Sequence, residues 1–160
     1  MATASPMWTY EVKYFINTSS TSTPVWTFVD YDSAFDPTRD NEEYEASYKA
    51  RKTQPKWVTS QSFEIEFDID IVASETLQAW FIEHEDDTNV PTDILRVWPI
   101  EVSSGTFPAK MAAFNMNENP LDGAAGEPIK ATGTMSMVDD GWTLGTVTYS
   151  GGVPTFATTV

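Results

Sequence analysis

The sequence predicts a mainly β fold, a β-sandwich or barrel with one packed α-helix. Apolar and polar residues alternate with a period of two over 8–17, 63–71 and 129–137, as they do in strands that bury one face. A single stretch, 74–86, repeats its apolar residues at helical spacing instead. The chain of 160 residues can bury one hydrophobic core, so we expect a single domain over 1–160.

The N-terminal part predicts an arm followed by two strands. Residues 1–7 show no periodicity and are expected to form an N-terminal arm. The alternation over 8–17 predicts the first strand. A polar turn over 18–24 separates it from a short β-prone run over 25–29.

The segment 30–57 interrupts this alternation and predicts a long loop. It is rich in charged residues and contains two prolines, and long loops in compact domains are commonly functional or disordered. Residues 44–51 are expected to form a strand only where a neighbour supplies a partner. Four of the nine basic residues of the chain lie here with no acid among them: Lys49, Arg51, Lys52 and Lys56. The segment is either a solvated loop or a basic surface that docks on an acidic neighbouring subunit or ring.

The clearest predicted strand is 63–71. Phenylalanine and isoleucine occupy every second position, which predicts one buried face. The positions between them are all acidic: Glu64, Glu66, Asp68 and Asp70. These carboxylates therefore share the other face of the strand, which is either a solvent-exposed side of a sheet or the lining of a channel.

The predicted helix covers 74–86. Ser74 suits the N-cap position, and Glu75 suits the positive end of the helix dipole. Leu77, Trp80 and Phe81 lie on its apolar stripe. His84 follows in the last turn, where a histidine interacts favourably with the dipole.

The C-terminal half predicts further strands over 94–102, 106–116 and 129–137, with a loop over 117–127. Residues 138–141 carry a hairpin turn signal before the next strand, 142–149. The last residues, 150–160, are expected to form a C-terminal arm.

The charge balance excludes several classes of function. The chain has 24 acidic and 9 basic residues, a net charge of −15, so it should repel phosphate backbones rather than read their sequence. Cysteine is absent, so no disulfide or thiol chemistry is available. No apolar run is long enough for a membrane helix, and we expect no membrane partner.

The sequence carries no catalytic pattern. The only histidine is His84, and the patterns of serine hydrolases, P-loop proteins and zinc peptidases are missing. The acidic clusters lack the spacing of a calcium loop. We therefore expect that the protein is not an enzyme and that it has no metal site and no cofactor.

The order of these segments resembles the bacteriophage major tail tube family, whose fold also occurs in type VI secretion tubes. The matching stretches are VWTFV at 25–29, FEIEFDIDI at 63–71, LQAWF at 77–81, ILRVWPIEV at 94–102, NMNENP at 115–120 and KATGTMSMVDDGWTLGTVTY at 130–149. The resemblance implies hexameric rings in which strands of neighbouring subunits join into one inner β-barrel. The rings stack through loops and terminal arms, and DNA passes through the lumen without sequence-specific binding.

The resemblance also implies a place for the protein and a set of partners. The chain would be made in the host cytoplasm and built into the virion tail, together with tape measure, terminator and baseplate proteins. On this view Glu64, Glu66, Asp68 and Asp70 line the lumen, while Lys49, Arg51, Lys52 and Lys56 contact neighbouring subunits or rings. Two alternatives stay open: a type VI tube-like ring protein, and a β-sandwich binding module of the carbohydrate-binding or adhesin kind.

Overall fold

The computed structural model describes residues 6–50 and 52–159, and a mainly β fold with one helix is confirmed. Ten strands form one antiparallel sheet that does not close on itself. The strands are β1 (Lys13–Asn17), β2 (Trp26–Phe28), β3 (Asp32–Glu45), β4 (Lys56–Asp70), β5 (Val90–Val97), β6 (Thr106–Glu118), β7 (Leu121–Asp122), β8 (Lys130–Met137), β9 (Thr143–Ser150) and β10 (Val153–Thr158). The helix α1 covers Thr76–Glu83, and a 3-10 turn covers Thr9–Glu11.

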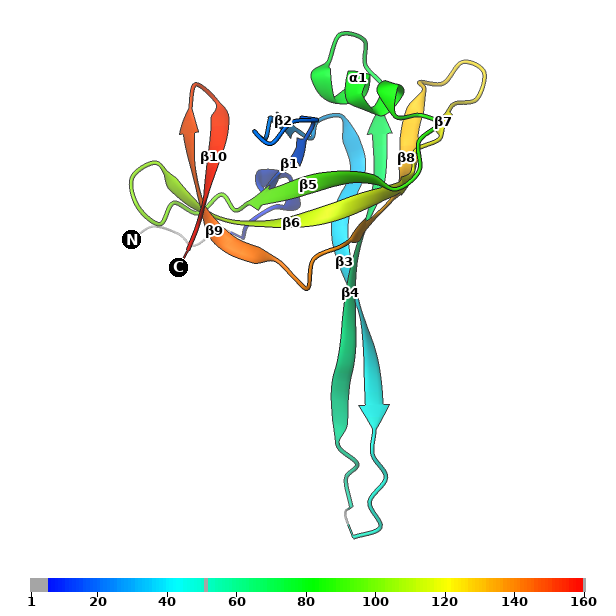
Figure 1. Cartoon of the computed structure of the whole chain (residues 1–160), viewed down its shortest axis with the longest axis vertical. Coiled ribbons are helices and arrows are strands. Elements are labelled where there is room, and N and C mark those ends of the chain that lie inside the picture. The colour runs from blue at the N-terminus through cyan, green and yellow to red at the C-terminus, as the bar shows by residue number, and fades with distance from the viewer. Residues whose placement is uncertain (1–5, 51, 160) are drawn as a thin grey trace.

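Strand β6 divides the sheet because its two halves pair with different strands. Along one edge it pairs with β5, which in turn pairs with β1 and β2. Along the other edge, Thr106–Met111 pairs with β9 and Phe114–Glu118 pairs with β8. The sheet therefore carries two wings, β8–β4–β3 and β9–β10, which leave β6 in different directions (Figure 1).

Each wing covers a different face of the central strands and buries its own core. In β1, Tyr14 and Ile16 belong to the first core, whereas Phe15 between them belongs to the second. The first core lies under β3, β4 and β8 and is closed by Leu77, Trp80 and Phe81 of α1. The second core is built from residues of β1, β5, β6 and β9: Phe15, Leu95, Val97, Ala109 and Val147.

The prediction of a loop over 30–57 is wrong for most of that segment. Residues 32–45 form β3, which pairs with β4 from Asp32 opposite Ile69 to Glu45 opposite Lys56. Only 46–55 connects the two strands, and the hairpin projects far from the body of the molecule (Figure 1). A two-stranded ribbon with no core beneath it can be charged on both faces, so alternation does not reveal it. Pro37 fits because β3 is an edge strand and its missing N–H faces no partner.

The prediction of a C-terminal arm over 150–160 is also wrong, because Val153–Thr158 forms β10, which pairs with β9. Gly151 and Gly152, both at positive φ (58° and 81°), make the tight turn between these strands. The turn at 138–141, by contrast, joins two strands that do not pair with each other. Strands β8 and β9 pair instead with the two halves of β6, so that each of them joins one wing to β6.

Several element boundaries differ from the expected ones. The helix is shorter than 74–86 because Ser74 has a left-handed backbone (φ 74°), and Glu75 takes the N-cap position without a side-chain cap bond. The first strand starts only at Lys13, after the 3-10 turn. Within the described ranges the single helix is far too short to cross a membrane.

Candidate functional site

The four acids of the sequence ladder lie on the outer face of β4. Ile65, Phe67 and Ile69 between them are buried in the first core, so the predicted alternation is confirmed. Glu64 and Glu66 are exposed, and Asp68 and Asp70 are half-buried. We call these four residues the acidic face.

The neighbours of the acidic face are small and polar. Residues paired directly across an antiparallel ladder point to the same side of the sheet. On β8 these partners are Ser136, Thr134, Thr132 and Lys130, in the order of the ladder from Glu64 to Asp70. Asn117 of β6 donates from Nδ2 to the hydroxyls of Ser136 at 2.9 Å and Thr134 at 3.1 Å. The acidic face is therefore one side of a wider polar, hydrogen-bonded surface.

Only part of the acidic face carries unpaired negative charge. The ammonium of Lys130 lies 3.3 Å from Oδ1 of Asp68 and 3.7 Å from Oδ1 of Asp70. The hydrogen bond to Asp68 is the main reason why the pKa of Lys130 lies above its ordinary value. Within the described residues, Glu64 and Glu66 have no such partner. On β3, Asp36 is the residue paired with Glu66 in the ladder.

The predicted basic contact residues fall at the far end of the β3–β4 hairpin. Lys49 and Lys52 are exposed in the connecting segment, which we call the hairpin tip (46–55), and Arg51 lies outside the described residues. Lys56 is held by the hairpin itself, 3.6 Å from Oε2 of Glu45 and 4.0 Å from Oε2 of Glu43. The outer part of the hairpin therefore separates Lys49, Lys52 and Lys56 from the acidic face (Figure 1).

The hairpin also exposes aromatic residues that the sequence patterns do not predict as contact residues. Tyr44 and Trp57 stack across the two strands with ring centroids 6.1 Å apart, although they are 58% and 47% exposed. Exposed large aromatic rings are characteristic of contact surfaces. The signal in the sequence is that Tyr44 and Trp57 are surrounded by charged and polar residues.

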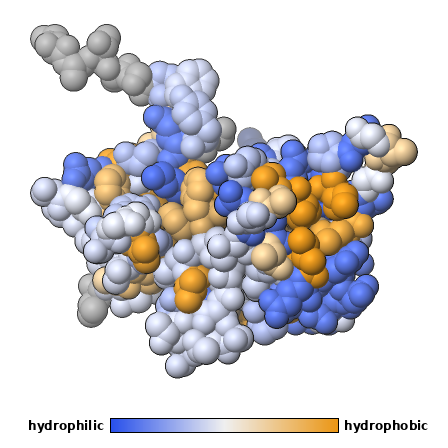
Figure 2. Space-filling view, turned by 90° about the horizontal axis from the view of Figure 1, so that it is seen from above, coloured by the Kyte–Doolittle hydropathy of each residue, from blue (hydrophilic) through white to orange (hydrophobic). Residues whose placement is uncertain are grey.

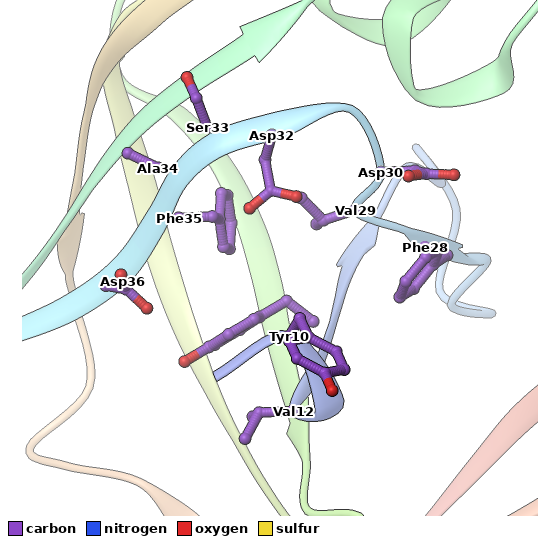
Figure 3. Close-up of a pocket in the computed structure, with 11 residues that line it drawn as sticks. Tyr10, Val12, Phe28, Val29, Asp30, Asp32, Ser33, Ala34, Phe35 and Asp36 are labelled. Carbon is purple, nitrogen blue, oxygen red and sulfur yellow. The ribbon is translucent and has the colours of Figure 1, made fainter. Parts of the chain in front are cut away.

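An acidic pocket of about 360 Å³ lies between β3 and the N-terminal segment. Asp32 and Asp36 of β3 face Tyr10 and Val12 across it (Figure 3). Burial raises the pKa of Asp32 above its ordinary value, and it raises the pKa of Tyr14, also in the pocket wall, to about 12. The pocket therefore holds charge at an energetic cost.

The lone histidine has a structural role. His84 ends α1, its Nδ1 lies 2.8 Å from Oδ2 of Asp87, and its ring packs on Trp80 with centroids 5.0 Å apart. Among the residues that the structure describes, no three histidine or carboxylate side chains are arranged to hold a metal ion.

This chain is similar to known proteins in its structure and not in its sequence. No protein-family model matches the chain, and no curated protein matches its sequence. The SPP1 tail tube subunit, solved by solid-state NMR and cryo-EM, superposes with a TM-score of 0.69 at 11% identity, over 87% of this chain and 78% of that one. A chain of the 6-fold symmetrised baseplate of the anti-feeding prophage superposes with a TM-score of 0.52 at 10% identity, over 90% of this chain and 97% of that one. At these identities the likeness establishes a shared fold.

Proposed function

We propose that this chain is a structural subunit of a bacteriophage tail tube, which assembles as stacked hexameric rings around an acidic lumen that conducts DNA during ejection. The observation that carries the proposal is an open amphipathic sheet in a fold shared with the SPP1 tail tube subunit. On this proposal the chain acts in the virion tail as a building element and not as an enzyme. Its partners are its own copies and other tail proteins.

Free strand edges supply the means of assembly. The sheet ends at β2 and β3, and β10 ends the second wing, so in the described ranges their outer edges pair with no strand. Such edges are templates for pairing with another chain. Edge-to-edge pairing of identical copies by a repeated rotation closes a ring, and the joined wings then form the wall of an inner barrel.

The acidic face supplies a surface past which DNA can slide. Asp68 and Asp70 share the charge of Lys130, so Glu64 and Glu66 carry the repulsion toward phosphate groups. Repeated around a ring, these carboxylates give the bore a negative potential, which keeps the DNA backbone from binding to the wall. The hydroxyl groups beside them keep the wall hydrated.

The hairpin tip supplies contacts between rings. Lys49 and Lys52 are exposed at its end, whereas Lys56 is satisfied within the hairpin. We therefore assign the electrostatic contacts with a neighbouring subunit or ring to Lys49 and Lys52. Arg51, part of the same basic segment, is proposed for the same role although it lies outside the described residues.

A second candidate is a ring protein elsewhere in a tail or in a related injection machine, including a type VI tube-like protein. The likeness to the chain of the anti-feeding prophage baseplate supports it, because nearly the whole of that chain is matched. Both candidates are ring-forming structural proteins, and they differ in whether rings stack without limit.

Electron microscopy of the purified chain at rising concentration tests the proposal. We expect rings and then hollow tubes as concentration increases, because edge pairing and stacking are both intermolecular. Rings that never stack would favour the second candidate. Single particles at every concentration would contradict ring assembly and favour a β-sandwich binding module.

A further inference from the structure

The molecule has two chemically opposite ends. The hairpin tip lies at one end, and α1 lies at the other together with the segment that leads from it into β5 (Figure 1). In the view toward the α1 end, hydrophobic and strongly hydrophilic areas of the surface lie side by side (Figure 2). Ile82, 52% exposed, belongs to this end, and an acidic run follows it in the chain.

A pocket of about 370 Å³ opens at the α1 end. Two segments line it, residues 85–88 after α1 and residues 118–121 between β6 and β7. Four acidic residues are among them: Glu85, Asp86, Asp87 and Glu118. Asp87 is engaged by His84, while the other three have no ion-pair partner among the described residues. We call this the acidic end pocket.

The oxygen of a buried side-chain amide in the wall of this pocket has no hydrogen-bond partner among the described residues. Asn119 lines the pocket and is 1% exposed. Its Nδ2 donates to the backbone oxygen of Phe81 at 2.7 Å, which fixes the orientation of the amide because the reverse orientation would oppose two oxygens. Its Oδ1 accepts no hydrogen bond from any residue that the structure describes. A buried acceptor without a donor is rare in folded proteins and calls for an outside group.

The chemistry of this site fits a basic side chain. Carboxylates and an amide oxygen are all acceptors, and a lysine ammonium carries three donors and no acceptor. A metal ion is the poorer match, because no three acidic or histidine side chains in the described ranges are arranged to ligate one.

The chain itself carries a matching cation at its opposite end. Most other cations are already engaged: Lys56 and Lys130 by carboxylates, and Arg96, Lys110 and Lys13 over aromatic rings. Lys49 and Lys52 of the hairpin tip are exposed and have no carboxylate partner within the described residues. Because the two features lie at opposite ends, one copy cannot satisfy its own pocket, whereas head-to-tail copies can.

We infer that the acidic end pocket receives a lysine of the hairpin tip, Lys49 or Lys52, from a second copy of this chain. The inference rests on the proposed function and deepens it, since it names the contact that joins one ring to the next. In the joined pair, the ammonium contacts the carboxylates of Glu85 and Glu118 and approaches Oδ1 of Asn119. The contact is repeated once per subunit, so its individual weakness is offset by the number of copies in a ring.

Thiol crosslinking tests the contact directly, because the natural chain has no cysteine. One copy carries Thr53→Cys in the hairpin tip, and the other carries Thr88→Cys in the pocket wall; both changes leave every charge in place. After mixing at a concentration that gives assembly, a short bismaleimide should join Cys at 53 to Cys at 88. We expect this product at least about tenfold faster than with Ser104→Cys, an exposed site outside the pocket, because docking raises the effective concentration of the two thiols.

The lysines are tested in the same assay. Adding Lys49→Glu and Lys52→Glu to the copy with Thr53→Cys should remove the preference for the pocket. A preference that survives this double change would overturn the assignment to lysine, and equal rates with the two acceptor sites would overturn the contact itself.

The outcomes also separate this inference from the proposed function. If the unmodified chain forms tubes but the cysteine variants show no preference for the pocket, the tube proposal stands and the inference fails. If the preference is found but microscopy shows no ring, the inference stands and the proposed ring fails.

Discussion

At the scale of the residue, the chain places acidic groups where they cost stability. The pKa of Asp32 is raised chiefly by burial and further by the charges of Asp30 and Asp36, while a backbone hydrogen bond works in the opposite direction. A carboxyl whose pKa is higher in the folded state binds more protons there. Stability therefore falls as pH rises from the ordinary value of 3.8 through the raised folded value.

Replacing Asp32 by asparagine tests this cost. Asp32→Asn should stabilise the unassembled chain at pH 7 by only a few tenths of a kcal/mol, because the partly exposed carboxylate is screened by water. The gain should disappear below about pH 3.8, where the aspartate is protonated in both states. Denaturant unfolding at the two pH values measures the difference, and a gain of equal size at both would point to packing instead of charge.

The acidic face makes a separate prediction about transport. Glu64→Lys with Glu66→Lys should leave the fold intact, since both side chains are exposed, and should slow DNA ejection by assembled tails through attraction to phosphate. The rate of DNA release from virions that carry the variant is the measurement. Glu127→Lys with Asp140→Lys makes the same change in net charge on exposed loops and serves as the control. Ejection at the normal rate by the acidic-face variant would contradict the proposed lumen.

Sequence patterns revealed these groups only in part. Alternation was enough to put Glu64 to Asp70 on one face, because a strand over a core obeys a period of two. It could not reveal that Lys130 neutralises Asp68 and Asp70, since that depends on the register of β4 against β8. The unpartnered oxygen of Asn119 depends on the contact between two segments 38 positions apart and left no local signal.

At the scale of the element, the strands and the helix that pack on a core were predictable from the sequence. The strands that cover no core were not. The strands around 63–71 and 129–137 and the helix at Leu77–Phe81 were found because each buries a regular stripe. The outer half of the β3–β4 hairpin buries no such stripe, so its charged sequence predicts a loop. The segment 150–160 predicts an arm and not a strand, because its pattern does not show that Gly151 and Gly152 make a tight turn back onto β9.

The docking of β10 depends on a glycine. A Cβ at Gly145 of β9 would collide with the backbone oxygen of Ala157 and the ring of Phe156 in β10. Gly145→Ala should therefore displace β10 and destabilise the chain by about 1–3 kcal/mol, the usual cost of overpacking. Denaturant unfolding gives the loss, and amide hydrogen exchange should show it concentrated in 153–158.

A matched glycine separates collision from backbone strain. Gly126 has a left-handed backbone (φ 87°) but open space around it. Gly126→Ala should cost about 1–2 kcal/mol through the backbone alone and leave exchange in β10 unchanged. Equal exchange in β10 for both variants would show that Gly145 is not needed for its docking.

At the scale of the whole molecule, the open sheet and the two opposite ends give the chain a direction. The wings end in free edges, and the hairpin tip and α1 lie at opposite ends of the long axis (Figure 1). The acidic end pocket is lined by the segment that follows α1. Side edges favour ring closure, and unlike ends favour stacking in one sense. The same chain can thus supply both kinds of contact that a tube requires.

A cryo-EM map of the concentrated, purified chain tests the central claim most directly, because it shows which face of β4 looks inward. We expect stacked six-membered rings in which Glu64 and Glu66 point into a central channel. Rings in which these two side chains point outward, or are buried between subunits, would contradict the acidic lumen.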